Sequence, residues 1–286
     1  MEKRELGKTG FEISAIAFDG IMVLGMDQEE SADIVAEAVA SGVDYFDAAP
    51  GAGDAQEALG PALAPHRKSV YLASRTDKRT AKEAQEDLEE SLRALRTDYL
   101  DVYQLSGLDD PDDIATAFGP GGAMEALAGA VEKGYVRSMG FTCRLDASAK
   151  AIMEQSGAFS TMQFPVNFAH SFKKRGGVDA IALCRGAGVG VVAVEALALR
   201  RWLDGEARNY PNCWYRPIYD DLTLAQLALN FAITQEVATA IPPGDKRLFR
   251  LALDIIEEQG GKARPLSPEE HTQLRRKAHE IQDVVF

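Results

Sequence analysis

Hydrophobic residues follow two alternating patterns along the chain. Short apolar runs bounded by glycine, proline or charged residues are typical of buried strands, and longer segments with apolar residues three or four positions apart are typical of amphipathic helices. The strands are expected at residues 15–18, 44–47, 70–74, 99–105, 136–143, 160–165, 188–196 and 238–241. The helices are expected at residues 31–40, 54–59, 80–94, 123–133, 147–155, 179–185, 222–234 and 246–258.

This order of elements predicts an α/β fold. Eight strand–helix alternations with short links are the pattern of a (β/α)8 TIM barrel, and we expect residues 1–286 to form one barrel domain. Glycines at both ends of residues 7–10 predict a turn and hence an N-terminal β-hairpin. An extra C-terminal helix is expected at residues 267–283, where Ser267 and Glu270 have the spacing of a capping box. The alternative is a doubly wound open sheet, but the glycine-rich motif that usually follows its first strand is absent.

Net charge, cysteine spacing and the length of apolar runs exclude several classes of partner and predict where the protein is located. The formal net charge is −13, and a strongly acidic protein is a poor partner for nucleic acids and anionic membranes. Cys143, Cys184 and Cys213 fit neither a disulfide framework nor a metal-binding motif, so no metal site is expected. No apolar run approaches the ~18 residues of a membrane span, and we expect a cytoplasmic protein. The sequence does not indicate an oligomeric state.

A carboxylate closes the second expected strand. Residues 44–51 read Asp-Tyr-Phe-Asp-Ala-Ala-Pro-Gly, so the apolar strand ends on Asp47 and breaks at proline and glycine. An acidic side chain at the end of a barrel strand is typical of a catalytic position, because active sites lie at the C-terminal face of such barrels. Tyr45 shares the strand face of Asp47, either as barrel packing or as a proton donor.

Several stretches of the chain resemble the aldo/keto reductase family. They are residues 6–10 (Leu-Gly-Lys-Thr-Gly), 46–50 (Phe-Asp-Ala-Ala-Pro), 91–105 (Ser-Leu-Arg-Ala-Leu-Arg-Thr-Asp-Tyr-Leu-Asp-Val-Tyr-Gln-Leu), 134–141 (Gly-Tyr-Val-Arg-Ser-Met-Gly-Phe), 163–167 (Gln-Phe-Pro-Val-Asn) and 241–244 (Ile-Pro-Pro-Gly). The resemblance implies a barrel whose bottom is closed by the hairpin. It also implies the reduction of carbonyl compounds with NADPH by four residues, an Asp, a Tyr, a Lys and a His.

At three of these four catalytic positions the chain departs from the family pattern. The Asp is present as Asp47, whereas Ala52 stands at the position of the Tyr, Arg75 at that of the Lys and Ser106 at that of the His. Alanine has no proton to give, arginine holds its protons with a pKa above ~12, and a serine hydroxyl is a neutral donor that is not tuned for protonation. Arg75 remains able to pair with Asp47 or to stabilise an oxyanion.

The resemblance also implies a binding site for NADP. Thr142, Gln163 and Asn167 correspond to residues on the nicotinamide side. The helix that begins after the last strand would hold the adenosine phosphate through backbone amides and cationic side chains. Its residues at this end are Gly244, Lys246, Arg247 and Arg250.

Three hypotheses of function follow. The first is an NADP(H)-binding relative of the reductases whose carbonyl reductase activity is lost or altered, and which responds to a small carbonyl compound or a sensor ligand. The alternative is an active NADPH-dependent carbonyl oxidoreductase with a rearranged proton donor. A third is an interaction protein without a cofactor, in which the long irregular segment at residues 200–221 is an interface rather than a lid or a structural loop.

Overall fold

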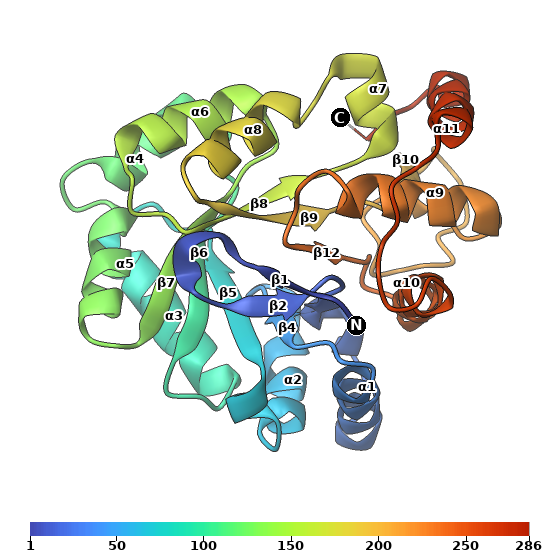
Figure 1. Ribbon diagram of the computed structural model, residues 1–286. Coiled ribbons are helices and arrows are strands. Elements are labelled where there is room, and N and C mark those ends of the chain that lie inside the picture. The colour runs from blue at the N-terminus through green and yellow to red at the C-terminus, as the bar shows by residue number, and fades with distance from the viewer. Residues whose placement is uncertain (286) are drawn as a thin grey trace.

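The computed structural model describes residues 1–285 and contains a sheet of eight parallel strands surrounded by helices (Figure 1). In chain order the strands are β3 (Phe18–Asp19), β4 (Tyr45–Asp47), β5 (Tyr71–Thr76), β6 (Leu100–Leu105), β7 (Val136–Thr142), β8 (Thr161–Pro165), β9 (Gly190–Val194) and β12 (Thr239–Ile241). Neighbouring strands in the sheet are also neighbours in the sequence of strands. This is the order that successive strand–helix units produce.

The sheet closes on itself between its first and last strands. Ile16 forms a parallel bridge with Ala240, and the Ala17 amide donates a hydrogen bond of 2.9 Å to the Ala240 carbonyl. Closure of this kind removes the sheet edges and makes the sheet a barrel. The predicted (β/α)8 barrel is therefore confirmed, and the open doubly wound sheet is excluded.

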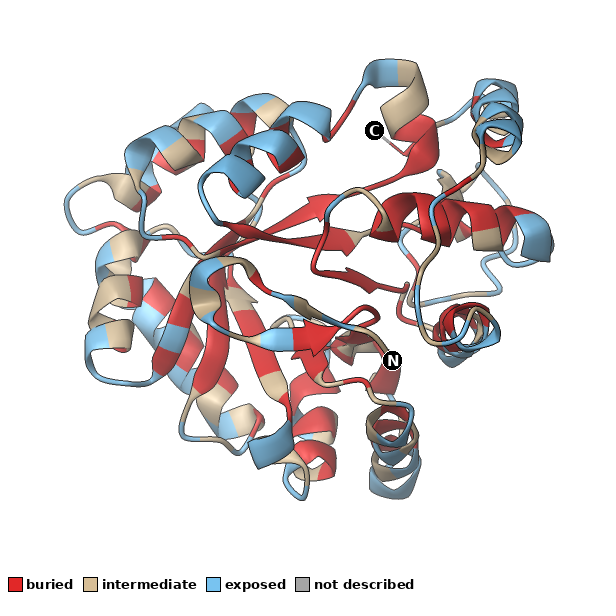
Figure 2. Ribbon diagram, viewed as in Figure 1, coloured by how far each residue is buried: buried red, intermediate tan, exposed pale blue. Residues whose placement is uncertain are grey.

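The helices cover the outside of the barrel, with their buried residues on the side that faces the strands and their exposed residues outside (Figure 2). They are α1 (Gln28–Ala40), α2 (Ala55–Leu63), α3 (Ala81–Ala94), α4 (Pro111–Phe118), α5 (Ala123–Glu132), α6 (Asp146–Gln155), α7 (Phe168–Lys174), α8 (Val178–Gly186), α9 (Leu222–Ile233), α10 (Lys246–Glu258) and α11 (Pro268–Glu280). The extra C-terminal helix is α11, and Ser267 and Glu270 form the expected capping box at its start. Helices α4 and α7 were not predicted from the sequence.

Helix α2 runs past the point where the sequence predicts its end. Gly60 and Pro61 lie inside it, although a glycine–proline pair is usually a stop signal. Gly60 is needed for packing, because a Cβ there would lie 2.7 Å from the backbone of Leu95, which follows α3. The expected end at residue 59 is thus wrong.

The N-terminal hairpin closes the bottom of the barrel. Strands β1 (Lys3–Glu5) and β2 (Glu12–Ser14) pair antiparallel and cross the barrel end (Figure 1). Gly7, with a φ of 54°, approaches so closely that a Cβ would lie 2.2 Å from the Gly190 amide nitrogen. Above the hairpin, the barrel interior is filled by buried side chains that include Leu6, Ile13, Tyr45, Val102 and Val192. Tyr45 is fully buried in this cluster, which makes it a packing residue.

A buried ionic cluster ties the N-terminal ends of β5, β6 and β7. Asp101 is fully buried; one carboxylate oxygen accepts a hydrogen bond of 2.7 Å from Arg137, and the other lies 2.9 Å from the Arg67 guanidinium. Both guanidinium groups also lie over the Tyr99 ring, at 3.9 and 4.3 Å from its centroid. Because each charge has partners, the buried carboxylate is compensated.

The long segment at residues 200–221 is anchored at several points. It is framed by a short antiparallel pair, β10 (Ala198–Arg200) and β11 (Arg216–Pro217). The Trp202 indole donates a hydrogen bond of 3.0 Å to the Cys213 carbonyl, and the Asn212 amide donates one of 3.3 Å to the Ile21 carbonyl. The Arg201 amide donates a hydrogen bond of 3.0 Å to the Asp283 carbonyl, so the segment links the C-terminal residues to the turn that follows β3.

Candidate active site

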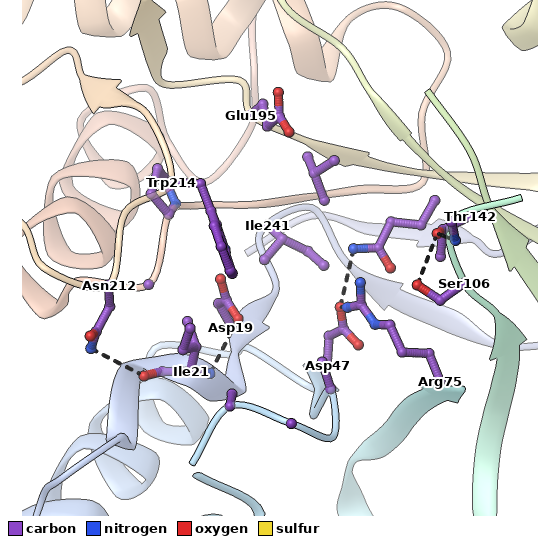
Figure 3. A pocket seen from close by; sticks show the side chains of 18 of the residues that line it. Asp19, Ile21, Asp47, Arg75, Ser106, Thr142, Glu195, Asn212, Trp214 and Ile241 are labelled. Atoms are coloured by element: carbon purple, nitrogen blue, oxygen red, sulfur yellow. Dashed lines mark hydrogen bonds and ion pairs between the residues drawn. The ribbon is translucent and has the colours of Figure 1, made fainter. Parts of the chain in front are cut away.

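A cavity of about 1080 Å³ opens at the C-terminal ends of the barrel strands. Its wall is built from the loops after the strands and from residues 212–215 of the long segment (Figure 3). All four positions that correspond to the family's catalytic residues line it, namely Asp47, Ala52, Arg75 and Ser106. The barrel thus brings together residues that lie far apart in the sequence, at the face where active sites of this fold are found.

Asp47 and Arg75 form an ion pair on neighbouring strands. Asp47 ends β4 and Arg75 lies near the end of β5, one residue beyond the predicted end of that strand. The Asp47 side chain is only 2% exposed, and Gln163 on β8 donates a second hydrogen bond of 3.2 Å to it. Burial raises the pKa of Asp47 above its usual value, while the Arg75 charge and the Gln163 hydrogen bond act against this rise. The guanidinium therefore compensates a carboxylate that water cannot reach.

Ser106 and Thr142 form a second, neutral group on the wall of the cavity. Ser106 follows β6 directly, and Thr142 ends β7. Their hydroxyl oxygens lie 3.3 Å apart, and the Thr142 hydroxyl also accepts a hydrogen bond of 2.9 Å from the Gly107 amide. Each hydroxyl can donate a hydrogen bond to a ligand, but neither carries a charge.

Ala52 lies in the loop between β4 and α2, and its side chain is a methyl group on the cavity wall. No phenol is therefore supplied from this position. Tyr215, from the long segment, also lines the cavity, and burial raises the pKa of its phenol, with Glu195 contributing. Since that segment shows no strong periodic pattern, the sequence did not predict Tyr215 as a site residue.

Asp19 is a site residue that the sequence analysis missed. It ends β3, where its backbone pairs in register with Asp47, and its half-buried side chain lines the cavity. Burial, together with the nearby Asp47 carboxylate, raises the pKa of Asp19 to about 7. The signal that could have found it is the one that found Asp47, a carboxylate at the end of a short apolar strand.

Glu195 is the second carboxyl group that the sequence did not predict. It follows β9 with a φ of 65°, an unusual conformation for a residue other than glycine. Burial raises the pKa of Glu195 to about 8, although the Arg144 charge acts in the opposite direction. Figure 3 shows Glu195 and Asp19 well apart on the cavity wall, with Trp214 on the side of Asp19.

The residues expected on the nicotinamide side divide into two groups. Thr142 and Gln163 line the cavity, and the Gln163 Oε1 atom is buried without a hydrogen-bond partner in the described structure. An unpartnered amide oxygen fits the amide N–H of a nicotinamide. Asn167 instead caps α7: its Nδ2 donates to the Glu195 and Ala198 carbonyls at 3.0 and 2.7 Å, and its Oδ1 accepts from two backbone amides.

Three of the four residues expected to hold an adenosine phosphate, Gly244, Arg247 and Arg250, are engaged with the protein's own groups. Gly244 lines the cavity, but a Cβ there would lie 2.0 Å from the Ile21 side chain, so Ile21 packs closely on it. Lys246 is exposed at the start of α10, outside the cavity wall. Arg247 forms an ion pair of 2.7 Å with Asp245, and Arg250 donates a hydrogen bond of 2.7 Å to Glu37. One end of the cavity thus offers an acceptor for a carboxamide, whereas Arg247 and Arg250 must leave these carboxylates before they can contact a phosphate.

Between residues 1 and 285, no three His, Cys, Asp or Glu side chains are grouped so that they could hold a metal ion. Over the same residues, every helix lacks the combination of length and apolar character that crossing a membrane requires.

Comparison with known proteins gives consistent matches. The model of the aldo/keto reductase family matches residues 17–213. The uncharacterized oxidoreductase YqkF of Bacillus subtilis is 24% identical over 318 aligned positions, which cover 99% of this chain and 98% of that protein. The aldo-keto reductase YhdN of the same organism is 34% identical over 124 positions, 37% of this chain and 38% of YhdN.

Solved structures show the same fold. The holo form of aldo-keto reductase AKR11C1 from Bacillus halodurans superimposes with a TM-score of 0.72 at 24% identity, covering 97% of this chain and 96% of that one. The thermostable aldo-keto reductase Tm1743, in complex with the inhibitor epalrestat, has a TM-score of 0.71 at 20% identity, covering 97% of this chain and 100% of that one.

Proposed function

Because the chain belongs to the aldo/keto reductase family, we propose that it binds NADP(H) in the cavity at the barrel mouth and that its carbonyl reductase activity is lost or altered. One observation carries this proposal. The buried Asp47 keeps a cationic partner in Arg75, but a methyl group, Ala52, stands where the family's proton donor is expected. The site therefore keeps the ion pair between Asp47 and Arg75 but has no acidic side chain at the position of the family's proton donor.

The missing acid matters because of the charge that develops during carbonyl reduction. When the nucleotide is bound, it supplies a hydride, and the carbonyl oxygen becomes an alkoxide that needs a proton or a positioned donor. A positioned general acid is worth about 100- to 10,000-fold in rate. Arg75 is a poor acid and its guanidinium already pairs with Asp47, while Ser106 offers only a neutral hydroxyl. The residues at these positions therefore account for a weak or absent reaction.

Two observations support the cofactor part of the proposal. The unpartnered Gln163 Oε1 lies in the cavity wall, where it can accept a hydrogen bond from a carboxamide. The relatives are named as oxidoreductases or aldo-keto reductases, and one similar structure is described as a holo form. NADP rather than NAD remains part of the proposal, as does a small carbonyl compound or sensor ligand as the second ligand.

The alternative, an active reductase with a rearranged donor, is favoured by a different observation. Asp19 and Glu195 line the cavity, and burial raises their pKa values to about 7 and about 8. Carboxyl groups with such pKa values carry protons near neutral pH and can act as acids. Under this alternative, one of them replaces the missing phenol.

Two measurements test the proposed function and its alternative. Titration with NADPH, followed by its fluorescence, is expected to show saturable binding; without binding, the proposed function fails and the cofactor-free interaction protein takes its place. Turnover of a reactive aromatic aldehyde by the NADPH-loaded protein is expected to stay near the uncatalysed background. A rate clearly above background that is lost in Arg75→Ala would instead establish an active reductase.

A further inference from the structure

The corner of the cavity around Asp47 presents hydrogen-bond acceptors. The Asp47 Oδ1 atom is buried and has no partner in the described structure, in a side chain that is only 2% exposed. Beside it, the Asp19 carboxyl group receives one hydrogen bond of 3.3 Å, from the Ile21 amide. Buried acceptors without partners are costly, so this corner is suited to a ligand that brings a hydrogen-bond donor or a positive charge.

The same corner has more carboxyl groups than cations. Asp19 and Asp47 are register partners on adjacent parallel strands, and the Arg75 guanidinium is paired with Asp47. A ligand that carries a positive charge would supply the partner that Asp19 lacks.

The excess of carboxyl groups over cations in this corner has opposite consequences for two classes of hydride acceptor, carbonyl compounds and iminium compounds. Reduction of a carbonyl compound builds a negative alkoxide, which the neighbouring carboxylates would repel. Reduction of an iminium compound removes a positive charge and requires no proton at that step. We propose that the cavity accepts an iminium compound, a protonated or N-alkylated imine, with the Asp19 carboxylate as its counter-ion. This inference rests on the proposed binding of NADP(H) for its reductant.

The step balances without an acid. The iminium carbon gains a hydride and is reduced, the π electrons of the C=N bond move to nitrogen as a lone pair, and the dihydropyridine ring of the reduced nucleotide is oxidised. The product is a neutral amine. For an imine that arrives uncharged, the proton that Asp19 retains near neutral pH passes to the imine nitrogen before reduction and leaves the carboxylate beside the new cation.

An aromatic side chain lies on the same side of the cavity. Trp214 lines the cavity and is 81% exposed, so its ring remains accessible to a ligand (Figure 3). Tryptophan is the most favourable aromatic partner for a cation. Figure 3 shows it on the side of Asp19, the residue whose carboxylate is proposed as counter-ion.

Binding to the free protein tests the charge preference without turnover. Isothermal titration compares N,N-dimethyl-tetrahydroisoquinolinium, a fixed cation that cannot be reduced, with the neutral ketone tetralone. We expect the cation to bind at least about tenfold more tightly, Asp19→Asn to lose this preference, and Asp87→Asn to keep it. Asp87 is the matched control because it is a cavity carboxyl on α3 whose pKa burial also raises. Equal binding of both compounds, or an equal loss in both variants, would overturn the proposal.

Turnover tests the chemistry. With NADPH present, consumption of N-methyl-dihydroisoquinolinium is compared with that of an aromatic aldehyde after subtraction of the uncatalysed rates. We expect reduction of the iminium compound only, with a fall of at least about tenfold in Asp19→Asn and no change in Asp87→Asn. A preference for the aldehyde would overturn the inference but leave NADPH binding intact. If NADPH does not bind, the proposed function is wrong. The isothermal titration of the free protein still tests whether Asp19 binds the cation, because it needs no NADPH.

Discussion

Replacement of Arg75 by methionine tests whether the ion pair at the barrel mouth holds a buried charge. The Asp47 carboxylate is 2% exposed and has Asp19 as its register partner, so loss of the guanidinium leaves two neighbouring carboxyl groups without a cation. Breaking a buried pair by removing one partner costs about 3–5 kcal/mol. Because Arg75 is itself 21% exposed, water can partly replace its charge, and we expect about 3 kcal/mol.

The cost should depend on pH. Burial raises the folded-state pKa of Asp47 above its usual value, and removal of Arg75 raises it further. A carboxyl group whose folded-state pKa is raised contributes stability at low pH and loses this contribution as the pH rises toward the folded-state pKa. We therefore expect Arg75→Met to cost about 3 kcal/mol at about pH 8 and less at about pH 5, because a raised pKa favours protonation of Asp47 as the pH falls and protonation relieves the unpaired charge.

Urea unfolding followed by circular dichroism at the two pH values measures this difference. The matched variants are Asp47→Asn and the double variant Asp47→Asn/Arg75→Met. Because the two side chains are in contact, a double-mutant cycle should give a coupling of about 2 kcal/mol near pH 8. Equal destabilisation by Arg75→Met at both pH values, or strictly additive effects in the cycle, would refute the claim that Arg75 compensates a buried charge.

Three further predictions concern stability and are measured by the same urea unfolding. Asp101→Asn should cost about 2–4 kcal/mol, since it removes the buried carboxylate that two arginines share, whereas the exposed Asp98→Asn should change stability by less than about 0.5 kcal/mol. Gly60→Ala should cost about 2 kcal/mol because a Cβ would meet backbone at 2.7 Å, while Gly129→Ala, in open space on α5, should add about 0.5–1 kcal/mol; equal effects would contradict the packing argument. Asp19→Asn should stabilise the protein by about 2 kcal/mol near pH 8 and have little effect near pH 4. The reason is that the pKa of Asp19 is raised to about 7 in the folded protein, so ionisation of Asp19 destabilises the native state as the pH rises from about 4 to about 8. An effect of the same size at both pH values would count against this explanation.

The barrel and its family could be predicted from sequence because their signals are local or periodic. Strand–helix alternation, the capping box at Ser267 and Glu270, and the acid that ends β4 all depend on residues close together in the chain. The end of α2 was misplaced at residue 59 because Gly60 has a tertiary role there, allowing α2 to pack against the chain after α3. A glycine that permits close packing and a glycine that ends a helix look the same in a sequence.

Sequence by itself determined the order of the elements, the closure of one barrel and the identity of the residues at the four positions of the family's catalytic site. Only the tertiary structure decided their partners. It paired Asp47 with Arg75, placed Asp19 beside them, and engaged Arg247 with Asp245 and Arg250 with Glu37. The physical reason is that side-chain pairing and desolvation depend on distances set when the barrel closes, and the contact between Arg250 and Glu37 spans 213 positions of the chain.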